Sequence, residues 1–230
     1  MIGNRAVQRI LSATLALLLQ GCGDPPARQD APAGDSVTVP PPAAGDIPTI
    51  VFLGTSITAG LGLDPEQAFP SVIQRKLDSA GFRYQVINAG QSGESSAGAL
   101  TRIDWILRQP PAILVIETGA NDGLRGQSPS AVRDNIQGII DRTRQCSPGT
   151  ENILTGMQAL PNLGSDYVRR FVAIYPELAE RNEIRLVPFI LGGVGGVDSL
   201  NQADGIHPTP RGQEIVAENV WQVLAPVLRR

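Results

Sequence analysis

The sequence has little of several residue types that metal-binding and disulfide-bonded proteins use. It contains one histidine, His207, and two cysteines, Cys22 and Cys146. One histidine and widely separated cysteines offer no plausible metal cluster, so neither a metal nor another cofactor is expected. If Cys22 is consumed by a modification, Cys146 is left without a partner, and no disulfide is expected.

Positive charge is also sparse and dispersed. Lys76 is the only lysine, the arginines are scattered along the chain, and the formal net charge is -3. A mildly acidic chain without a run of basic residues lacks the electrostatic footprint of a nucleic-acid-binding protein. No nucleic-acid partner is therefore expected.

Long hydrophobic runs are missing as well, and the one notable run lies at the N-terminus. The mainly apolar stretch Ile10–Leu19 follows Arg5 and Arg9. It is too short to span a membrane, which takes roughly 20 apolar residues, but it suits the hydrophobic region of a secretory signal. The protein is therefore expected to be exported.

The end of this run resembles a bacterial lipoprotein signal, because Leu19-Gln20-Gly21 is followed by Cys22. In such a signal the cysteine receives lipid and becomes the mature N-terminus. Residues 1–22 are accordingly expected to form a lipoprotein-type signal segment, with the protein periplasmic or attached to the outer membrane through its lipid. Gln20 departs from the small or β-branched residue usual at its position, so ordinary cleavage nearby is the alternative.

Residues 23–46 differ in composition from the rest of the chain. They are rich in Pro, Ala, Gly and Asp, and their only large apolar side chains are Val37 and Val39. Such a segment cannot bury enough surface to offset its ordering entropy. It is expected to act as a tether, leaving residues 47–230 as the folded domain.

From Ile47 onward, short apolar runs alternate with amphipathic segments of helical periodicity. Runs of this length, bounded by turn residues, are typical of buried strands. Five are expected, over residues Thr49–Leu53, Tyr84–Asn88, Ala112–Glu117, Asn152–Met157 and Arg185–Phe189. Five strands alternating with five helices predict an α/β fold with three layers, α/β/α. The sheet is expected to be five-stranded, mostly parallel and doubly wound, as in flavodoxin-like folds.

The boundaries of several helices can also be predicted. Ser128 and Pro129 are expected to be the cap and the first residue of the third helix. Pro176 is expected to kink or split the fourth helix, whose apolar face is Val168, Phe171, Val172, Tyr175 and Leu178. The last helix is expected to run from about Pro210 to Leu228.

Residues able to do chemistry follow the predicted strands, where parallel sheets place their ligand sites. Ser56 comes directly after the first strand, in the segment Gly54-Thr55-Ser56-Ile57-Thr58. A serine in such a loop is by itself more often a helix cap or a turn residue. Its candidacy as a nucleophile depends on what the rest of the chain supplies.

His207 is the candidate base. It lies in the segment Asp204-Gly205-Ile206-His207-Pro208. A serine hydroxyl becomes a good nucleophile when an imidazole takes its proton. The imidazole in turn needs a partner on its other nitrogen, and Asp204, three residues earlier, can lie on the same turn. Ser56, His207 and Asp204 are therefore the candidate catalytic residues.

Two further segments, Asn88-Ala89-Gly90 and Gly119-Ala120-Asn121-Asp122, each follow a strand. Each alone would be interpreted as a turn. A tetrahedral oxyanion needs preorganised hydrogen-bond donors. The backbone N–H groups of Ser56 and Gly90 and the side-chain amide of Asn121 are the candidate oxyanion hole.

These four segments, in this order, resemble the conserved blocks of the SGNH (GDSL-type) hydrolase family. The resemblance covers the chain from about Thr49 to Leu228 and is strongest to the bacterial branch of thioesterase I, arylesterase and lysophospholipase L1. It implies an acyl-transfer mechanism through an acyl-enzyme, without a metal. One departure is Thr55, where the family usually has aspartate; threonine can form hydrogen bonds locally but carries no charge.

The function expected from this resemblance is hydrolysis of carboxylic esters or thioesters, with small acyl or aryl esters, lipid-derived ones included, as substrates. The segments expected to rim the site, Met157–Leu163 and Ile190–Val197, are rather apolar, which suits medium acyl or aryl groups. A carbohydrate deacetylase of the same fold is the main alternative. A non-catalytic ligand-binding lipoprotein and a protease are the others.

Overall fold

The computed structural model describes residues 47–229. The expected signal segment, Cys22 and the expected tether lie outside the described residues, as does Arg230. Among residues 47–229, no helix combines the length and hydrophobicity that crossing a membrane requires. Cys146 carries an exposed, free thiol.

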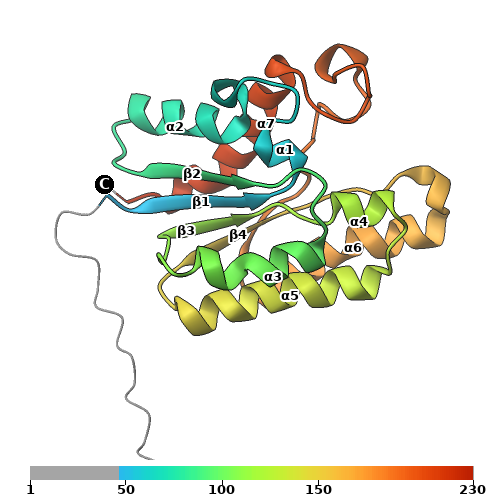
Figure 1. Ribbon diagram of the computed structural model, residues 1–230, viewed down its shortest axis with the longest axis horizontal. Helices are drawn as coiled ribbons and strands as arrows, with labels where there is room; N and C mark the ends of the chain where they lie inside the picture. The colour runs from blue at the N-terminus through green and yellow to red at the C-terminus, as the bar shows by residue number, and fades with distance from the viewer. Residues whose placement is uncertain (1–46, 230) are drawn as a thin grey trace, which may run out of the picture. The chain divides into compact units, whose positions relative to one another are not determined.

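The centre of the fold is a five-stranded sheet in which every pair of neighbouring strands is parallel (Figure 1). The order across the sheet is β2-β1-β3-β4-β5, the arrangement of flavodoxin-like folds. The strands are β1 (Thr49–Gly54), β2 (Gln85–Gly90), β3 (Ile113–Ile116), β4 (Glu151–Thr155) and β5 (Arg185–Val187). The predicted fold class is confirmed.

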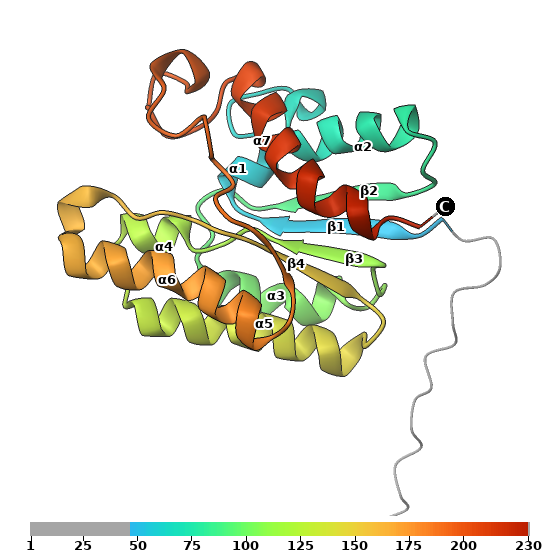
Figure 2. The ribbon, with the colours of Figure 1, turned by 180° about the vertical axis from the view of Figure 1, so that it is seen from behind.

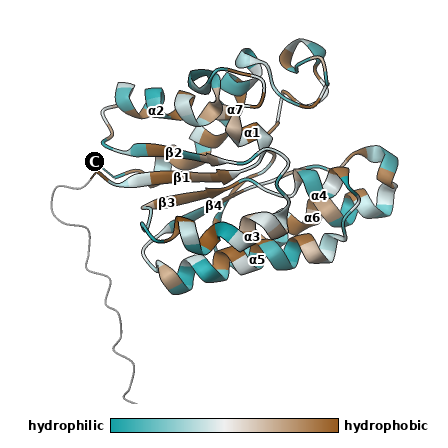
Figure 3. Cartoon of the chain, in the orientation of Figure 1, coloured by the Kyte–Doolittle hydropathy of each residue, from teal (hydrophilic) through white to brown (hydrophobic). Residues whose placement is uncertain are grey.

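Helices cover both faces of this sheet. Helices α2 (Phe69–Ser79) and α7 (Pro210–Leu224) lie on one face. The other face is covered by α3 (Ser96–Ile106), α5 (Pro129–Cys146) and α6 (Ser165–Arg181), as Figures 1 and 2 show from opposite sides. Because both faces are covered, the inner strands are hydrophobic along most of their length (Figure 3), and all four residues of β3 are buried.

One part of a prediction is wrong: Pro176 does not split the fourth helix, because α6 runs unbroken through it. Proline removes the hydrogen bond to the carbonyl of Val172. Both residues lie on the exposed side of the helix, so water can satisfy that carbonyl. Val172, expected to face the core, is 37% exposed.

Two other helix ends differ in detail from their prediction. Ser128 and Pro129 occupy the expected cap and first positions of α5, but the Ser128 side chain makes no capping bond and pairs with Ser130 at 2.7 Å instead. Helix α7 ends at Leu224, and a short 3₁₀ turn, Ala225–Val227, follows it. Pro226 accounts for the early end, since it cannot donate to a continuing helix.

Two very short helices lie at the carboxyl ends of neighbouring strands. Helix α1 (Ser56–Ala59) begins two residues after the end of β1, and α4 (Ala120–Leu124) begins four residues after the end of β3. Strands β1 and β3 are neighbours in the sheet, but the chain leaves β1 toward β2 on its other side. This is the topological switch point at which such folds bind their ligands.

Candidate active site

Ser56 is the first residue of α1 and is 8% exposed. The turn that carries it from β1 into the helix is tight and excludes side chains at two glycines. A Cβ on Gly54 would lie 1.9 Å from the Thr58 hydroxyl oxygen, and one on Gly90 would lie 2.3 Å from the backbone nitrogen of Ala59. Both glycines are therefore needed for β1, β2 and α1 to approach one another.

A buried carboxyl group lies beneath this turn. Glu117, at the end of β3, is 1% exposed. Its Oε2 accepts the backbone N–H of Thr55 at 2.7 Å and the Thr58 hydroxyl at 2.8 Å, and its Oε1 accepts the Thr55 hydroxyl at 2.9 Å. Burial raises the pKa of Glu117 above its ordinary value, while these hydrogen bonds oppose the rise.

His207 lies between the other two candidate catalytic residues. Its Nε2 is 2.8 Å from the Ser56 hydroxyl oxygen, and its Nδ1 is 2.6 Å from Oδ2 of Asp204. The loop that presents the imidazole turns at Gly205, whose φ of 69° lies in the left-handed region. The structure thus brings Ser56, His207 and Asp204 together in the predicted order.

Asp204 is tied to its own loop as well as to the imidazole. Its Oδ1 accepts the backbone N–H groups of Ile206 at 2.9 Å and His207 at 3.0 Å. The hydrogen bond from the His207 ring, followed by those two amides, holds the pKa of Asp204 well below its usual range. Asp204 is consequently an ionised acceptor at neutral pH, although its side chain is 45% exposed.

The three predicted oxyanion donors lie at the carboxyl ends of the strands. They differ in whether their N–H groups already form hydrogen bonds within the protein. Within the described chain, no hydrogen bond engages the N–H of Ser56. One N–H of the Asn121 side chain donates to the Glu94 carbonyl at 3.0 Å, which leaves its second hydrogen. The N–H of Gly90 donates to Oδ1 of Asn88 at 2.9 Å, a contact that sequence reasoning did not anticipate.

The position of Asn121 depends on an unusual turn and a buried phenol. Gly119 has a φ of 101°, and a Cβ there would lie 2.3 Å from the Tyr175 hydroxyl oxygen. That hydroxyl donates to the carbonyl of Thr118 at 3.0 Å. Tyr175 in α6 therefore holds the strand-to-helix turn that presents Asn121 at the start of α4.

An apolar cavity of about 250 Å³ adjoins these residues. Ile57, Ala120 and Ile206 line it, and each is the chain neighbour of a candidate site residue: Ser56, Asn121 and His207. The rest of the lining includes Met157, Ala159, Leu160, Pro161, Leu191, Gly195 and Gly196. Residues 157–161, Leu191, Gly195 and Gly196 of this lining belong to the two segments, 157–163 and 190–197, that were expected to rim the site.

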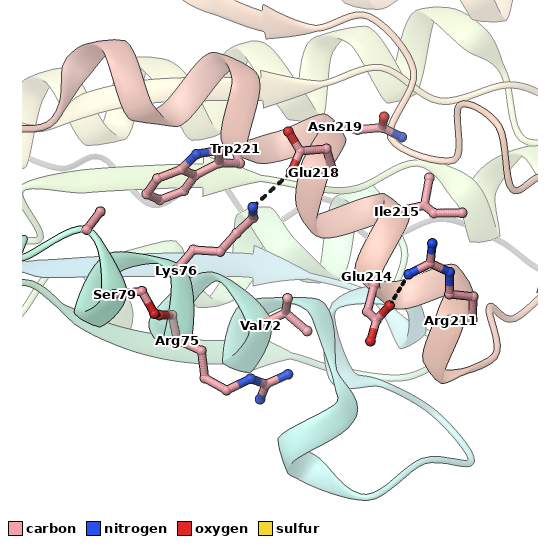
Figure 4. Close-up of a pocket in the computed structure, with 11 residues that line it drawn as sticks. Val72, Arg75, Lys76, Ser79, Arg211, Glu214, Ile215, Glu218, Asn219 and Trp221 are labelled. Carbon is pink, nitrogen blue, oxygen red and sulfur yellow. Dashed lines mark hydrogen bonds and ion pairs between the residues drawn. The ribbon is translucent and has the colours of Figure 1, made fainter.

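A larger, open concavity of about 810 Å³ lies elsewhere, between α2 and α7, and contains none of the predicted site residues. Figure 4 shows two ion pairs among its charged groups, in which Arg75 takes no part. Lys76 reaches Glu218 at 2.8 Å and lies 5.4 Å from the centre of the Trp221 ring, while Arg211 pairs with Glu214. This concavity takes no part in the site around Ser56.

The part of the chain that the structure describes holds no group of three His, Cys, Asp or Glu side chains placed to bind a metal ion. The chemistry available from these residues is proton transfer and nucleophilic attack. A serine hydroxyl in contact with an imidazole can lose its proton to that ring. The ionised Asp204 can stabilise the imidazolium that results.

Comparison with known proteins gives the class of this three-layer α/β/α protein, which is that of the carboxylic ester hydrolases. Residues 52–215 match the model of the GDSL-like lipase/acylhydrolase family. The chain belongs to this family, the SGNH hydrolases, as its sequence motifs indicate.

Individual relatives are similar over most of the chain. The esterase TesA of Pseudomonas aeruginosa is 42% identical over 181 residues, 78% of this chain and 89% of that protein. The Escherichia coli protein named thioesterase 1/protease 1/lysophospholipase L1 is 32% identical over 187 residues, 81% of this chain and 86% of that one. The crystal structure of TesA superposes with a TM-score of 0.75, covering 78% of this chain and 99% of that one.

Three residues that shape the site carried no usable signal in the sequence. Glu117 was expected only as the last residue of a strand, and nothing in its spacing indicated that it contacts Thr55. Glu94 and Arg102 were not singled out, although they are paired at 2.6 Å and partly buried next to Asn121. Charged residues in a loop and on a helix are usually solvated, so only the folded structure separates these from the rest.

Proposed function

We propose that this protein hydrolyses carboxylic esters by a serine mechanism in which Ser56 is the nucleophile, His207 the general base and Asp204 the residue that orients the imidazole. The observation that carries the proposal is the position of His207, with Nε2 2.8 Å from the Ser56 hydroxyl and Nδ1 2.6 Å from Asp204. With Nδ1–H donated to the carboxylate, Nε2 has a lone pair directed at the serine.

The reaction has two halves. His207 takes the hydroxyl proton as Ser56 attacks the carbonyl carbon, and the tetrahedral intermediate collapses when His207 protonates the departing alcohol or thiol. Water then attacks the acyl-enzyme with His207 again as base. The ester bond to Ser56 breaks, its oxygen recovers the proton, and the carboxylic acid leaves.

The negative charge of the tetrahedral intermediate needs donors that are already in place. The unengaged N–H of Ser56 and the second side-chain hydrogen of Asn121 are two such donors. The Gly90 N–H becomes the third when the oxyanion competes with Asn88 for it. An anionic oxygen is the stronger acceptor, since charge-assisted hydrogen bonds are about twice as strong as neutral ones.

The cavity beside Ser56 supports an apolar acyl or aryl group as the recognised part of the substrate. Its volume of about 250 Å³ is below the roughly 300–1,000 Å³ of sites that enclose a whole drug-sized ligand. Its lining is dominated by Leu, Ile, Met, Phe, Ala and Gly. A deacetylase acting on carbohydrate would instead need polar groups around a small acyl site, so this alternative has less support.

The test uses the full chain and a series of p-nitrophenyl esters from acetate to palmitate, together with matched acyl thioesters. We expect hydrolysis with an optimum at short to medium acyl length and its loss in Ser56→Ala. Ser130→Ala, which changes an exposed serine at the start of α5, is the control and should keep full activity. Equal, near-background rates in the wild type and Ser56→Ala would contradict the proposal and favour a ligand-binding protein.

We propose in addition that residues 1–21 are removed and that Cys22 is lipidated, which would attach the protein to a bacterial envelope membrane. The support is the sequence alone, an apolar run followed by Leu-Gln-Gly-Cys. Mass spectrometry of the protein from membrane fractions should show a mature chain that starts at Cys22 and carries acyl groups. An unlipidated chain starting elsewhere would overturn this part of the proposal.

A further inference from the structure

Arg102, on helix α3, contacts three segments of the chain. Each segment either contains one of the candidate oxyanion donors or forms a hydrogen bond to it. Its Nη2 donates to the carbonyl of Ala89 at 2.7 Å and, over a longer 3.4 Å, to the carbonyl of Gly54. Ala89 directly precedes Gly90, and Gly54 lies two residues before Ser56. The guanidinium thus joins the ends of β1 and β2.

The third segment is reached through an ion pair. Nε and Nη2 of Arg102 donate to the two carboxylate oxygens of Glu94 at 2.6 and 2.7 Å. The backbone carbonyl of the same Glu94 accepts the side-chain N–H of Asn121 at 3.0 Å. Glu94 therefore connects Arg102 to the third donor, its side chain facing one partner and its main chain the other.

This cluster is sheltered from water. The Glu94 side chain is 4% exposed and the Arg102 side chain 20% exposed. A buried, two-pronged ion pair fixes the direction of both side chains more firmly than an exposed one does. Glu94 neutralises the guanidinium, and the Nε and Nη2 groups of Arg102 donate to protein acceptors.

We propose that Arg102 is a positioning residue of the oxyanion hole, which sets the relative placement of the Ser56 amide, the Gly90 amide and the Asn121 side chain. The inference rests on the proposed function of these three donors. Arginine suits the task because its planar guanidinium presents five N–H donors in fixed directions, whereas lysine offers one compact ammonium. A shift of about 1 Å in a catalytic group can cost about 10²-fold in rate.

The test compares Arg102→Lys and Arg102→Met with the wild type on a p-nitrophenyl ester. Arg102→Lys keeps a cation beside Glu94 but cannot reach all the carbonyls, and should fold. We expect kcat to fall about 10-fold or more in Arg102→Lys and about 10²-fold in Arg102→Met, with KM within about twofold. The pH profile should be unchanged, because Arg102 does not contact His207. Arg142→Lys, which alters an exposed ion pair from α5 to Asp104 on α3, is the matched control.

A double-mutant cycle separates positioning from a general loss of structure. If Arg102 acts through Asn121, Arg102→Lys should lower kcat less in an Asn121→Ala background than in the wild type. Equal losses in both backgrounds, unchanged kcat in both Arg102 variants, or unfolding of Arg102→Lys at the assay temperature would each overturn the inference. Failure of the proposed function has a different signature, which is wild-type activity at background or retained in Ser56→Ala.

Discussion

The backbone N–H and the hydroxyl of Thr55 both donate to the buried carboxyl group of Glu117, at 2.7 and 2.9 Å. This contact joins the residue before the candidate nucleophile to the end of the neighbouring strand β3. It also explains why threonine can stand where the family usually has aspartate. A hydroxyl can donate to the Glu117 carboxyl group, which an ionised aspartate could not do.

Thr55→Val should reduce both stability and turnover, because it removes a hydroxyl donor from a buried carboxyl group while keeping the shape of the side chain. Leaving a buried polar group without a hydrogen bond costs about 1–3 kcal/mol, and the Ser56 turn rests on this contact. Thr55→Ser restores the hydroxyl and should recover most of the loss. Urea unfolding and p-nitrophenyl ester kinetics on the three proteins measure both effects. Equal turnover in the valine variant would show that the backbone N–H contact alone holds the turn.

Glu117 should make the stability of the fold depend on pH in a definite direction. Its pKa is raised in the folded state, chiefly by burial, so the unfolded chain releases the proton at lower pH than the folded chain does. The contribution is therefore fully present below about pH 4.5 and is lost as the pH rises through the folded-state pKa. Glu117→Gln should flatten this part of the profile of unfolding free energy against pH.

The control for that experiment is Glu177→Gln, which changes an exposed glutamate on α6. Denaturant unfolding of the wild type and both variants at several pH values from 4 to 8 gives the comparison. A profile for Glu117→Gln parallel to that of the wild type would mean that Glu117 does not titrate differently on folding.

The pH dependence of activity should reflect one titrating group on its acidic side. Because the pKa of Asp204 lies well below its usual range, that carboxylate stays ionised at pH 5 and above. The His207 imidazole must be neutral to act as base, so kcat/KM should rise with pH through a single ionisation. A logarithmic plot with a slope of one is expected, and a slope of two would contradict this assignment.

Asp204→Asn tests the contribution of Asp204 to the hydrogen-bonded pair that it forms with His207. The amide keeps the size of the side chain but removes the charge that stabilises the imidazolium, and it can favour the wrong tautomer. A loss of kcat of about 10⁴-fold is expected, the size found for the same change in a serine protease triad. Asp198→Asn, in the 3₁₀ turn Asp198–Leu200, should leave kcat near the wild-type value, and a similar loss there would point to a general effect on this loop.

Substitution of Gly195 should shorten the preferred acyl chain. Gly195 lines the cavity, its φ is ordinary, and an added Cβ would make only van der Waals contact, 3.5 Å from the ring of Phe189. Gly195→Val should therefore fill cavity space without strain. If two methylenes are excluded, at about 0.8 kcal/mol each, kcat/KM for octanoate falls roughly 10-fold while acetate is unaffected.

Gly149→Val is the matched control for this prediction, because Gly149 faces open space away from the cavity. The measured quantity is the ratio of kcat/KM for p-nitrophenyl octanoate and acetate in each protein. An unchanged ratio in Gly195→Val would place the acyl group outside this cavity.

The sequence predicted the sheet and the arrangement of Ser56, His207 and Asp204 because both depend on local signals. Buried strands are read from short apolar runs, and the ends of parallel strands meet at one edge. The supporting contacts could not be read in this way. The pairing of Arg102 with Glu94 and of Thr55 with Glu117 joins residues whose contact no spacing or periodicity in the sequence indicates. The continuity of α6 through Pro176 likewise depends on which side of the helix faces water.

The proposed nucleophile and oxyanion donors and much of the cavity lining follow different strands of the sheet. This separation has a consequence for how substrate preference can evolve. The proposed nucleophile and oxyanion donors follow β1, β2 and β3, whereas much of the cavity lining follows β4 and β5, in segments 157–161 and 189–196. Substitutions in those two segments alter which acyl group fits while leaving Ser56, Gly90 and Asn121 supported as before. Substrate preference can therefore diverge among descendants of one ancestor by exchange of two loops, without passing through an inactive intermediate.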